Sequence, residues 1–185
     1  MKGEQGERRS LGAIMFTDMV GYSSISRRDE SLVLQLLEEH RSIRSLLPIY
    51  NGTEIKTMGD TFLVEFASAE ESVKCACEIQ QSLHKLNGSR PPEKQTFVRI
   101  GVHLGDVIHK LGDIYGNAVN VASRIEPLAE KEGVCISGEV YAQVRNKIGF
   151  PLVSIGSREF KNVQTPIEVY KVVLPWEKLE PHSKP

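Results

Sequence analysis

The sequence predicts an α+β fold built on a ferredoxin-like βαββαβ kernel, with an antiparallel or mixed sheet and a C-terminal helix and two strands added to it. Strand-like and helix-like spacings of apolar residues alternate in the order strand, helix, strand, strand, helix, strand, which is the order of that kernel. The 185 residues suffice for one domain with a sizeable core and not for two ordinary ones. We expect the helices to cover one face of the sheet.

The first half of the chain supplies one helix and three strands of the kernel. Residues 1–10 are polar and charged, which is typical of a flexible leader. Leucines and isoleucines at helical spacing predict an amphipathic helix after the first apolar run, and Asn51-Gly52 predicts a turn. The elements expected here are a strand at residues 11–17, a helix at 29–47, and strands at 53–56 and 61–66.

The second half completes the kernel and adds the C-terminal part. Ser68 followed by Glu71 has the form of a capping box, which predicts the start of a helix. Gly105 predicts a bulge or bend in the strand that contains it. The elements expected are helices at residues 68–87, 117–129 and 138–145, strands at 97–108, 134–137, 157–160 and 167–173, and a tail or linker at 176–185, which leaves one domain at 11–175.

Composition excludes several classes of function and favours a cytoplasmic location. The formal net charge of −1 gives no broad electrostatic footprint for nucleic acid. The apolar stretch at residues 11–20 is interrupted by Asp18 and is about half the length of a membrane span, so we expect no membrane contact from this segment. Cys75, Cys77 and Cys135 are odd in number, which favours buried thiols in a reducing compartment over a disulfide framework, with metal binding as the alternative.

Two aspartates lie where apolar strands open into turns. Asp18 closes the first apolar run, and Asp60 follows Gly59 between the next two strands. Mg²⁺ prefers hard oxygen ligands and keeps coordination positions for substrate phosphates, so carboxylates from neighbouring strands suit it. The pattern predicts a site for two metal ions that act at phosphorus.

Three motifs in this order resemble the signatures of class III nucleotidyl cyclases. They are Phe16-Thr17-Asp18, Lys56-Thr57-Met58-Gly59-Asp60 and the run from Asp113 to Arg124, DIYGNAVNVASR. The run 160–163 and the run 166–170 are similar to the closing strand pair of the same family. The motifs extend over nearly the whole chain, so the resemblance covers residues 11–175 as a class III cyclase catalytic domain.

The resemblance implies a reaction and a role for each matching residue. In this family the ribose 3′-hydroxyl of a nucleoside triphosphate attacks the α-phosphorus and pyrophosphate leaves. Asp18, Asp60 and the backbone carbonyl of Met19 match the family's ligands for two Mg²⁺ or Mn²⁺ ions per site. Arg124 matches the residue that stabilises charge on the α-phosphoryl group, and Asn120, one helical turn earlier, matches the residue that positions the ribose.

Base choice depends, by the same resemblance, on Lys56 and Asp113. Adenine presents an acceptor at N1 and a donor at N6, which a lysine donor and an aspartate acceptor satisfy. Guanylyl cyclases resemble this chain but have Glu and a small Cys or Ser at these two positions. The pair therefore indicates ATP over GTP, and Lys161 matches, more loosely, a residue that binds the β- or γ-phosphate.

The resemblance further implies a homodimer whose two active sites lie at the interface. Asp18 and Asp60 would come from one chain, and Lys56, Asp113, Asn120 and Arg124 from the other, so a monomer should be inactive. Regulatory domains outside this chain are a further expectation from the family.

Taken singly, each of these residues has an ordinary explanation, such as a strand end, a turn or an exposed charge; their co-occurrence favours the enzyme. The alternatives are a cyclase-like module that binds nucleotide or dimerises without turnover, and a cyclase with relaxed base preference that accepts GTP. A ferredoxin-like RNA-binding domain would need exposed aromatics on the sheet and a basic surface, and neither is evident in the sequence.

Overall fold

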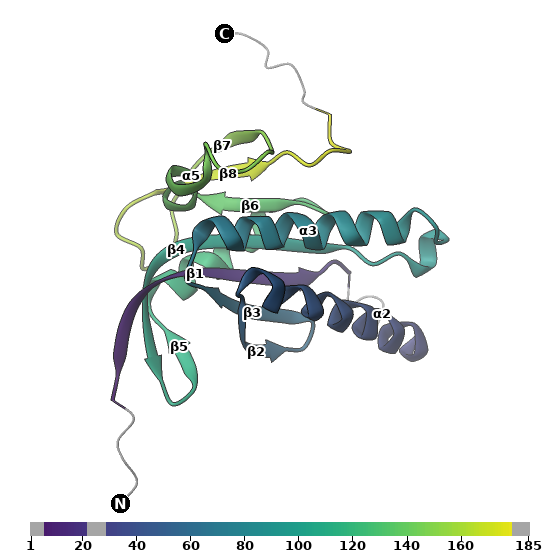
Figure 1. Cartoon of the computed structure of the whole chain (residues 1–185), viewed down its shortest axis with the longest axis horizontal. Helices are drawn as coiled ribbons and strands as arrows, with labels where there is room; N and C mark the ends of the chain where they lie inside the picture. The colour runs from purple at the N-terminus through teal and green to yellow at the C-terminus, as the bar shows by residue number, and fades with distance from the viewer. Residues whose placement is uncertain (1–5, 22–28, 179–185) are drawn as a thin grey trace, which may run out of the picture.

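The computed structural model describes residues 6–21 and 29–178, which form a mixed sheet with helices packed on it (Figure 1). The strands are hydrogen-bonded in the order β2-β3-β1-β4-β6-β8-β7, and β5 pairs with β4. The elements are β1 (Arg8–Met19), α2 (Glu30–Ile43), β2 (Thr53–Met58), β3 (Thr61–Phe66), α3 (Ala69–Asn87), β4 (Val98–Lys110), β5 (Asp113–Tyr115), α4 (Asn117–Ile125), β6 (Val134–Ser137), α5 (Gly138–Val144), β7 (Leu152–Arg158) and β8 (Ile167–Val172).

The βαββαβ kernel is confirmed. β1, α2, β2, β3, α3 and β4 follow one another, and β1 lies between β3 and β4 with antiparallel pairing on both sides. The pairing of β1 with β4 runs without interruption from Arg8 opposite His109 to Met19 opposite Val98. β1 therefore begins three residues before the expected strand, and residues 8–10 of the expected leader belong to the sheet.

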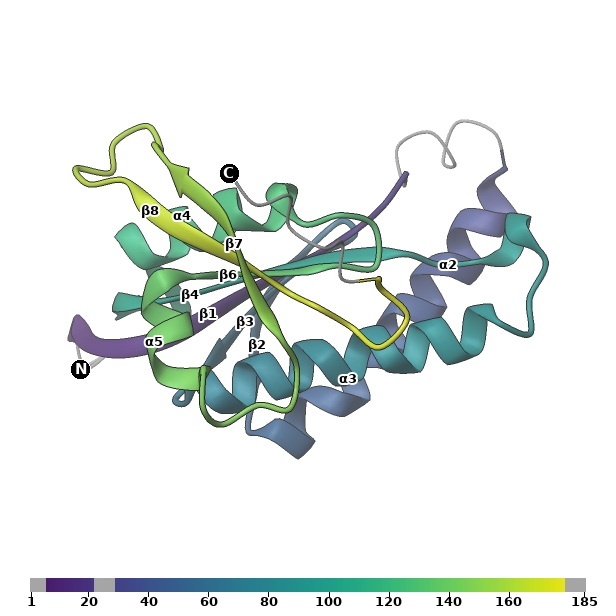
Figure 2. The same ribbon diagram turned by 90° about the horizontal axis from the view of Figure 1, so that it is seen from above.

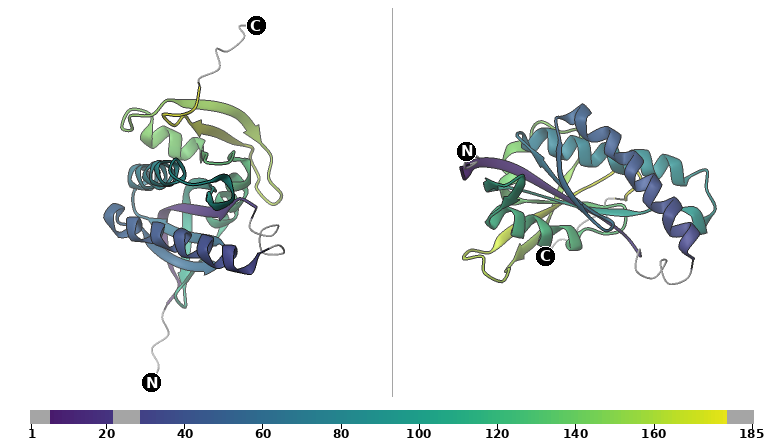
Figure 3. Two further views of the ribbon diagram at one scale, coloured as in Figure 1. Left: turned by 90° about the vertical axis from the view of Figure 1, so that its right-hand side faces the viewer. Right: turned by 90° about the horizontal axis from the view of Figure 1, so that it is seen from below.

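The helices cover both faces of the sheet, so the expectation that they lie on one face was wrong (Figures 2 and 3). Ala13 and Met15 of β1 pack in the core under α3, whereas Ile14 and Phe16 pack with Ala118 of α4 on the opposite face. All four β1 side chains are buried. The continuous apolar run at 13–16 is the reason, because a strand covered on both faces has no polar alternation.

Prolines shorten two of the expected helices. α2 ends at Ile43 and continues as a 3₁₀ helix, η1 (Arg44–Tyr50), which contains Pro48. α4 ends at Ile125 and is followed by another 3₁₀ turn, η3 (Glu126–Leu128), with Pro127 in it. Proline lacks the N–H that an α-helix needs and its ring clashes with the preceding turn, so neither helix reaches the end that apolar spacing alone predicted.

The irregularities of the strands differ from the prediction. β4 passes through Gly105 in register with Gly12, with no bulge. A Cβ at Gly105 would lie 3.0 Å from the Cβ of Ala118, so glycine here allows α4 to approach the sheet. The register shifts lie instead in β2, between Glu54 and Lys56, and in β7, which begins before the strand expected at 157–160. The three-residue β5 was not predicted.

The predicted helix cap and the predicted buried thiols are confirmed. The Ser68 hydroxyl caps α3 by accepting the Glu71 N–H at 3.3 Å. The three cysteines are buried, free thiols, and burial raises the pKa of each to about 12. Trp176, in the expected tail, stacks on His84 of α3 with ring centroids 3.9 Å apart. Within residues 6–21 and 29–178, no helix is both long and apolar enough to cross a membrane.

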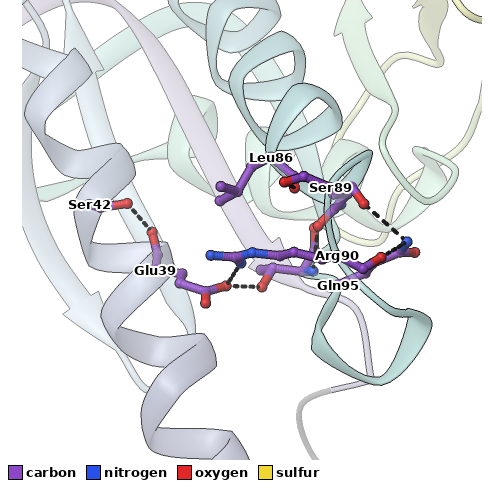
Figure 4. Close-up of polar contacts among 8 residues, drawn as sticks. Glu39, Ser42, Leu86, Ser89, Arg90 and Gln95 are labelled. Atoms are coloured by element: carbon purple, nitrogen blue, oxygen red, sulfur yellow. Dashed lines mark hydrogen bonds and ion pairs between the residues drawn. The ribbon is translucent and has the colours of Figure 1, made fainter.

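Polar contacts fix α2 to the loop between α3 and β4 (Figure 4). The Glu39 carboxylate forms an ion pair with Arg90 and accepts a hydrogen bond from the Thr96 hydroxyl at 2.7 Å. The Gln95 amide donates to the backbone carbonyl of Arg90 at 3.1 Å, which holds the loop in shape. α2 is thereby anchored at a point beyond its apolar contacts with the sheet.

Candidate active site

A carboxylate pair lies at one end of the central strands. Asp18 is the next-to-last residue of β1, and Asp60 lies in the tight turn between β2 and β3, where Gly59 has a φ of +63°. The antiparallel register places Thr17 opposite Phe62, so Asp18 meets the start of β3, and the Thr61 hydroxyl donates to Asp18 Oδ1 at 2.9 Å. The fold therefore brings together the two aspartates that the sequence singled out.

The two carboxylates repel each other. Burial, and after it the charge of Asp18, raises the pKa of Asp60 to about 6 from 3.8, although the backbone N–H groups of Asp60 and Met19 hydrogen-bond to its carboxylate and act in the opposite direction. A divalent cation between the carboxylates would relieve this repulsion. The donor set, two carboxylates with the Met19 backbone beside them, fits a hard cation such as Mg²⁺ or Mn²⁺.

Arg99 and Glu126 join this site and were missed by the sequence analysis. Arg99 Nη2 lies 3.2 Å from Asp18 Oδ2, and its Nε lies 3.2 Å from Glu126 Oε1. Burial, followed by the charge of Asp18, raises the pKa of Glu126 to about 7, and Arg99 opposes this rise. The sequence carries one signal for Arg99: it is a lone charge inside an apolar strand, at Val98-Arg99-Ile100. A charge in such a place needs a partner of opposite charge.

The charge balance of the carboxylate site is acidic. Among the described residues, its three carboxylates face one guanidinium, that of Arg99. No cluster of three His, Cys, Asp or Glu side chains with the geometry of a metal site is found in the described part of the chain. Any ion held here would therefore take oxygens from the two aspartates, from backbone and from a ligand.

The two residues predicted to read the base form a direct contact. Lys56 Nζ of β2 lies 2.7 Å from Asp113 Oδ2 at the start of β5, and both side chains are partly exposed. The other carboxylate oxygen of Asp113 accepts the N–H of Ile114 at 2.8 Å. The hydrogen bond from Lys56 is the main cause that lowers the pKa of Asp113. A donor and an acceptor thus lie side by side at a solvent-accessible edge.

The residues predicted to act on the ribose and the phosphates lie on α4 and in the loop before β8. Asn120 and Arg124 are separated by one turn of α4, and Asn120 is exposed. Arg124 Nη1 donates to the backbone carbonyl of Lys161 at 2.6 Å, and Lys161 itself is exposed. The predicted site residues therefore form three groups within one chain: Asp18 with Asp60, Lys56 with Asp113, and Asn120 and Arg124 with Lys161.

Comparison with known proteins identifies the family. A family model described as the adenylate and guanylate cyclase catalytic domain matches residues 6–173. The chain belongs to this family. The cyclase domain is 38% identical over 165 residues to putative adenylate cyclase 3 of Rhizobium meliloti, covering 88% of this chain, and 29% identical over 182 residues to adenylate cyclase 1 of the same organism, covering 86%. It spans only 28% and 27% of the lengths of these two relatives.

Solved structures of cyclases share the fold. The adenylate/guanylate cyclase/hydrolase of Silicibacter pomeroyi superimposes with a TM-score of 0.85 at 34% identity, over 91% of this chain and 99% of that one. The adenylyl cyclase CyaB of P. aeruginosa gives a TM-score of 0.78 at 21% identity, over 95% and 100% of the two chains. The predicted fold class and the predicted family are both confirmed.

Proposed function

We propose that this cyclase domain is an adenylate cyclase, which converts ATP to 3′,5′-cyclic AMP and pyrophosphate at the interface of a homodimer. The observation that carries the choice of ATP is the contact between Lys56 and Asp113. An ammonium donor beside a carboxylate acceptor complements N1 and N6 of adenine, and guanine presents the opposite pattern. A mismatched base would cover these two polar groups and leave them without hydrogen-bond partners, which discriminates by orders of magnitude. The names of the Rhizobium meliloti relatives agree with this choice.

The carboxylate pair would hold the metal ions. Asp18 and Asp60, with the backbone carbonyl of Met19, would bind two Mg²⁺ or Mn²⁺ ions, which supply Lewis-acid activation of the 3′-hydroxyl and neutralise charge on the departing pyrophosphate. Arg99 holds one oxygen of Asp18 and Thr61 holds the other, so the carboxylate is oriented before any ligand arrives. Preorganisation of this kind reduces the rearrangement needed during the reaction.

The residues of α4 would act on the sugar and the reacting phosphate. Arg124 presents a planar fork of donors suited to the charge that develops on the α-phosphoryl group. Its bond to the Lys161 carbonyl ties the fork to the loop before β8, where the Lys161 ammonium would bind the β- or γ-phosphate. Asn120, one turn earlier on α4, would position the ribose.

A second copy of the chain completes each site in this proposal. The metal pair of one protomer would face the base-reading pair and α4 of its partner, and two-fold symmetry would then create two equal sites. Since the chain spans less than a third of the Rhizobium meliloti relatives, regulatory domains outside it are part of the same proposal.

Product formation from equimolar ATP, GTP, CTP and UTP with Mn²⁺ tests the function, measured by chromatography over a range of protein concentrations. We expect cyclic AMP as the dominant product and a specific activity that rises with protein concentration as dimers form. Comparable amounts of cyclic GMP would contradict the base choice. Absence of any cyclic product, at a concentration where sedimentation shows a dimer, would favour a binding module without turnover.

A further inference from the structure

A β-bulge in β2 determines the face on which Lys56 lies. Glu54 pairs with Val64 and Lys56 pairs with Leu63, so Ile55 is an extra residue in the ladder. Directly opposed residues share a face of the sheet. Lys56 therefore lies on the face of Leu63, where Ile55 also packs, and both side chains are on the side of α4 and β5.

Without the bulge, Lys56 would point away from Asp113. Side chains alternate along a regular strand, so a slip of one residue moves every side chain to the other face. Among the described strands, β2 is the last one of the sheet, and β3 is its one neighbour in the strand order. The contact of Lys56 with Asp113 is partly exposed, and such ion pairs contribute little to rigidity. The bulge needs another constraint.

Arg44 supplies this constraint from the opposite face. The Nε of Arg44 lies 2.5 Å from Glu54 Oε2, and its Nη2 donates a hydrogen bond to the Thr57 hydroxyl at 2.8 Å. The Thr57 hydroxyl in turn donates to Glu54 Oε1 at 2.6 Å. The guanidinium also lies over the Phe62 ring, 4.6 Å from its centroid. Residues 54 and 57 would lie on opposite faces of a regular strand; here the bulge brings both to the face of Phe62. The guanidinium can contact both residues only in the bulged register.

We propose that this Arg44 clamp, formed by Arg44 with Glu54 and Thr57, is a positioning device for base recognition, which holds the Ile55 bulge so that Lys56 meets Asp113 and thereby sets the preference for ATP. The inference rests on the proposed adenylate cyclase activity. An arginine is required because its planar guanidinium presents several N–H donors at fixed angles, so that one side chain can contact both Glu54 and Thr57. A lysine ammonium does not have this geometry.

The first test measures nucleotide preference as the ratio of kcat/KM for ATP to kcat/KM for GTP. Arg44→Ala, Arg44→Lys and Thr57→Val should each lower the ratio, by about tenfold for Arg44→Ala, because base readout depends on a placed hydrogen-bond donor. Arg41→Ala is the matched control, since Arg41 lies on α2 and pairs only with the exposed Glu38 among the described contacts. A purely structural role would lower turnover of both nucleotides equally and leave the ratio unchanged, which would overturn the proposal.

The second test does not depend on turnover. The pKa of the Asp113 carboxyl, followed by ¹³C NMR in the nucleotide-free domain, should rise in Arg44→Ala and Thr57→Val, because the hydrogen bond from Lys56 lowers it in the unmodified domain. An unchanged pKa in both folded variants would overturn the clamp even if the unmodified domain makes no cyclic nucleotide. Absence of product in the unmodified domain would instead refute the proposed function, and the titration would still decide whether Arg44 positions Lys56.

Discussion

Replacing Asp60 with asparagine should stabilise the metal-free domain at neutral pH. In the native domain the pKa of Asp60 is raised from 3.8 to about 6, by burial first and by the charge of Asp18 second. The proton is therefore held more tightly in the folded state than in the unfolded state. The contribution of Asp60 to the free energy of unfolding is fully present below pH 4 and is lost as pH rises from 3.8 to about 6. Asparagine does not titrate, so Asp60→Asn removes this loss.

The size of the effect follows from the same two pKa values. Their difference corresponds to about 3 kcal/mol at full value. The site is partly open to solvent, which screens the repulsion, so we expect a gain of about 1 kcal/mol above pH 7 and none near pH 4. Urea unfolding in the presence of a chelator, at pH 4 to 8, measures the free energy of unfolding directly.

Added Mn²⁺ should make the native domain more stable than the Asp60→Asn domain. An ion that binds the folded domain raises its free energy of unfolding in proportion to the logarithm of its concentration, and Asp60→Asn should lose most of this gain. Asp106→Asn is the control, because Asp106 is an exposed carboxylate of β4 outside the pair, and it should change stability by less than about 0.5 kcal/mol. A metal-free Asp60→Asn domain no more stable than the native one at pH 8 would refute the reasoning.

Four predictions concern activity. Asp60→Ala should abolish metal-dependent turnover and leave the dimer intact in sedimentation; retained activity would refute the metal role. Arg124→Ala should lower kcat by about 100-fold or more with a small change in KM, as expected for a group that acts on transition-state charge; a change in KM alone would contradict this. Mixing Asp60→Ala with Arg124→Ala should restore about a quarter of native activity, because half of the dimers are mixed and each mixed dimer has one intact site. No recovery of activity after subunit exchange would argue against sites shared between protomers. Lys56→Glu combined with Asp113→Cys should shift preference toward GTP by about tenfold or more, measured as a ratio of kcat/KM values.

Local chemistry made part of this fold predictable. Ser68 and Glu71 predicted the start of α3, and the apolar run at 13–16 predicted a buried strand, because both signals depend on residues close together in the sequence. That run also carried the information that both faces of β1 are covered. A short apolar run does not, however, say which helix covers which face.

The site residues that belong to sequence motifs were predictable, and those brought in by contacts between distant parts of the chain were not. Asp18 and Asp60 come together as expected, and Lys56 meets Asp113. Arg99 lies far from Asp18 in the sequence, so only the pairing of β1 with β4 places them together. The bulge at Ile55 has no glycine to mark it, and the Arg44 side chain that contacts Glu54 beside it comes from another element.

The hairpin of β2 and β3 connects two functions that the sequence presents as neighbours. Lys56 and Asp60 are four residues apart on it, yet they face different groups: Lys56 meets Asp113, and Asp60 meets Asp18. In the proposed dimer these two residues serve different active sites. A hairpin held in one register by Arg44 would therefore fix the proposed base-reading lysine of one site relative to a proposed metal ligand of the other. The short spacing in the Lys56-Thr57-Met58-Gly59-Asp60 motif follows from this geometry, because an added residue would flip one of the two side chains to the wrong face.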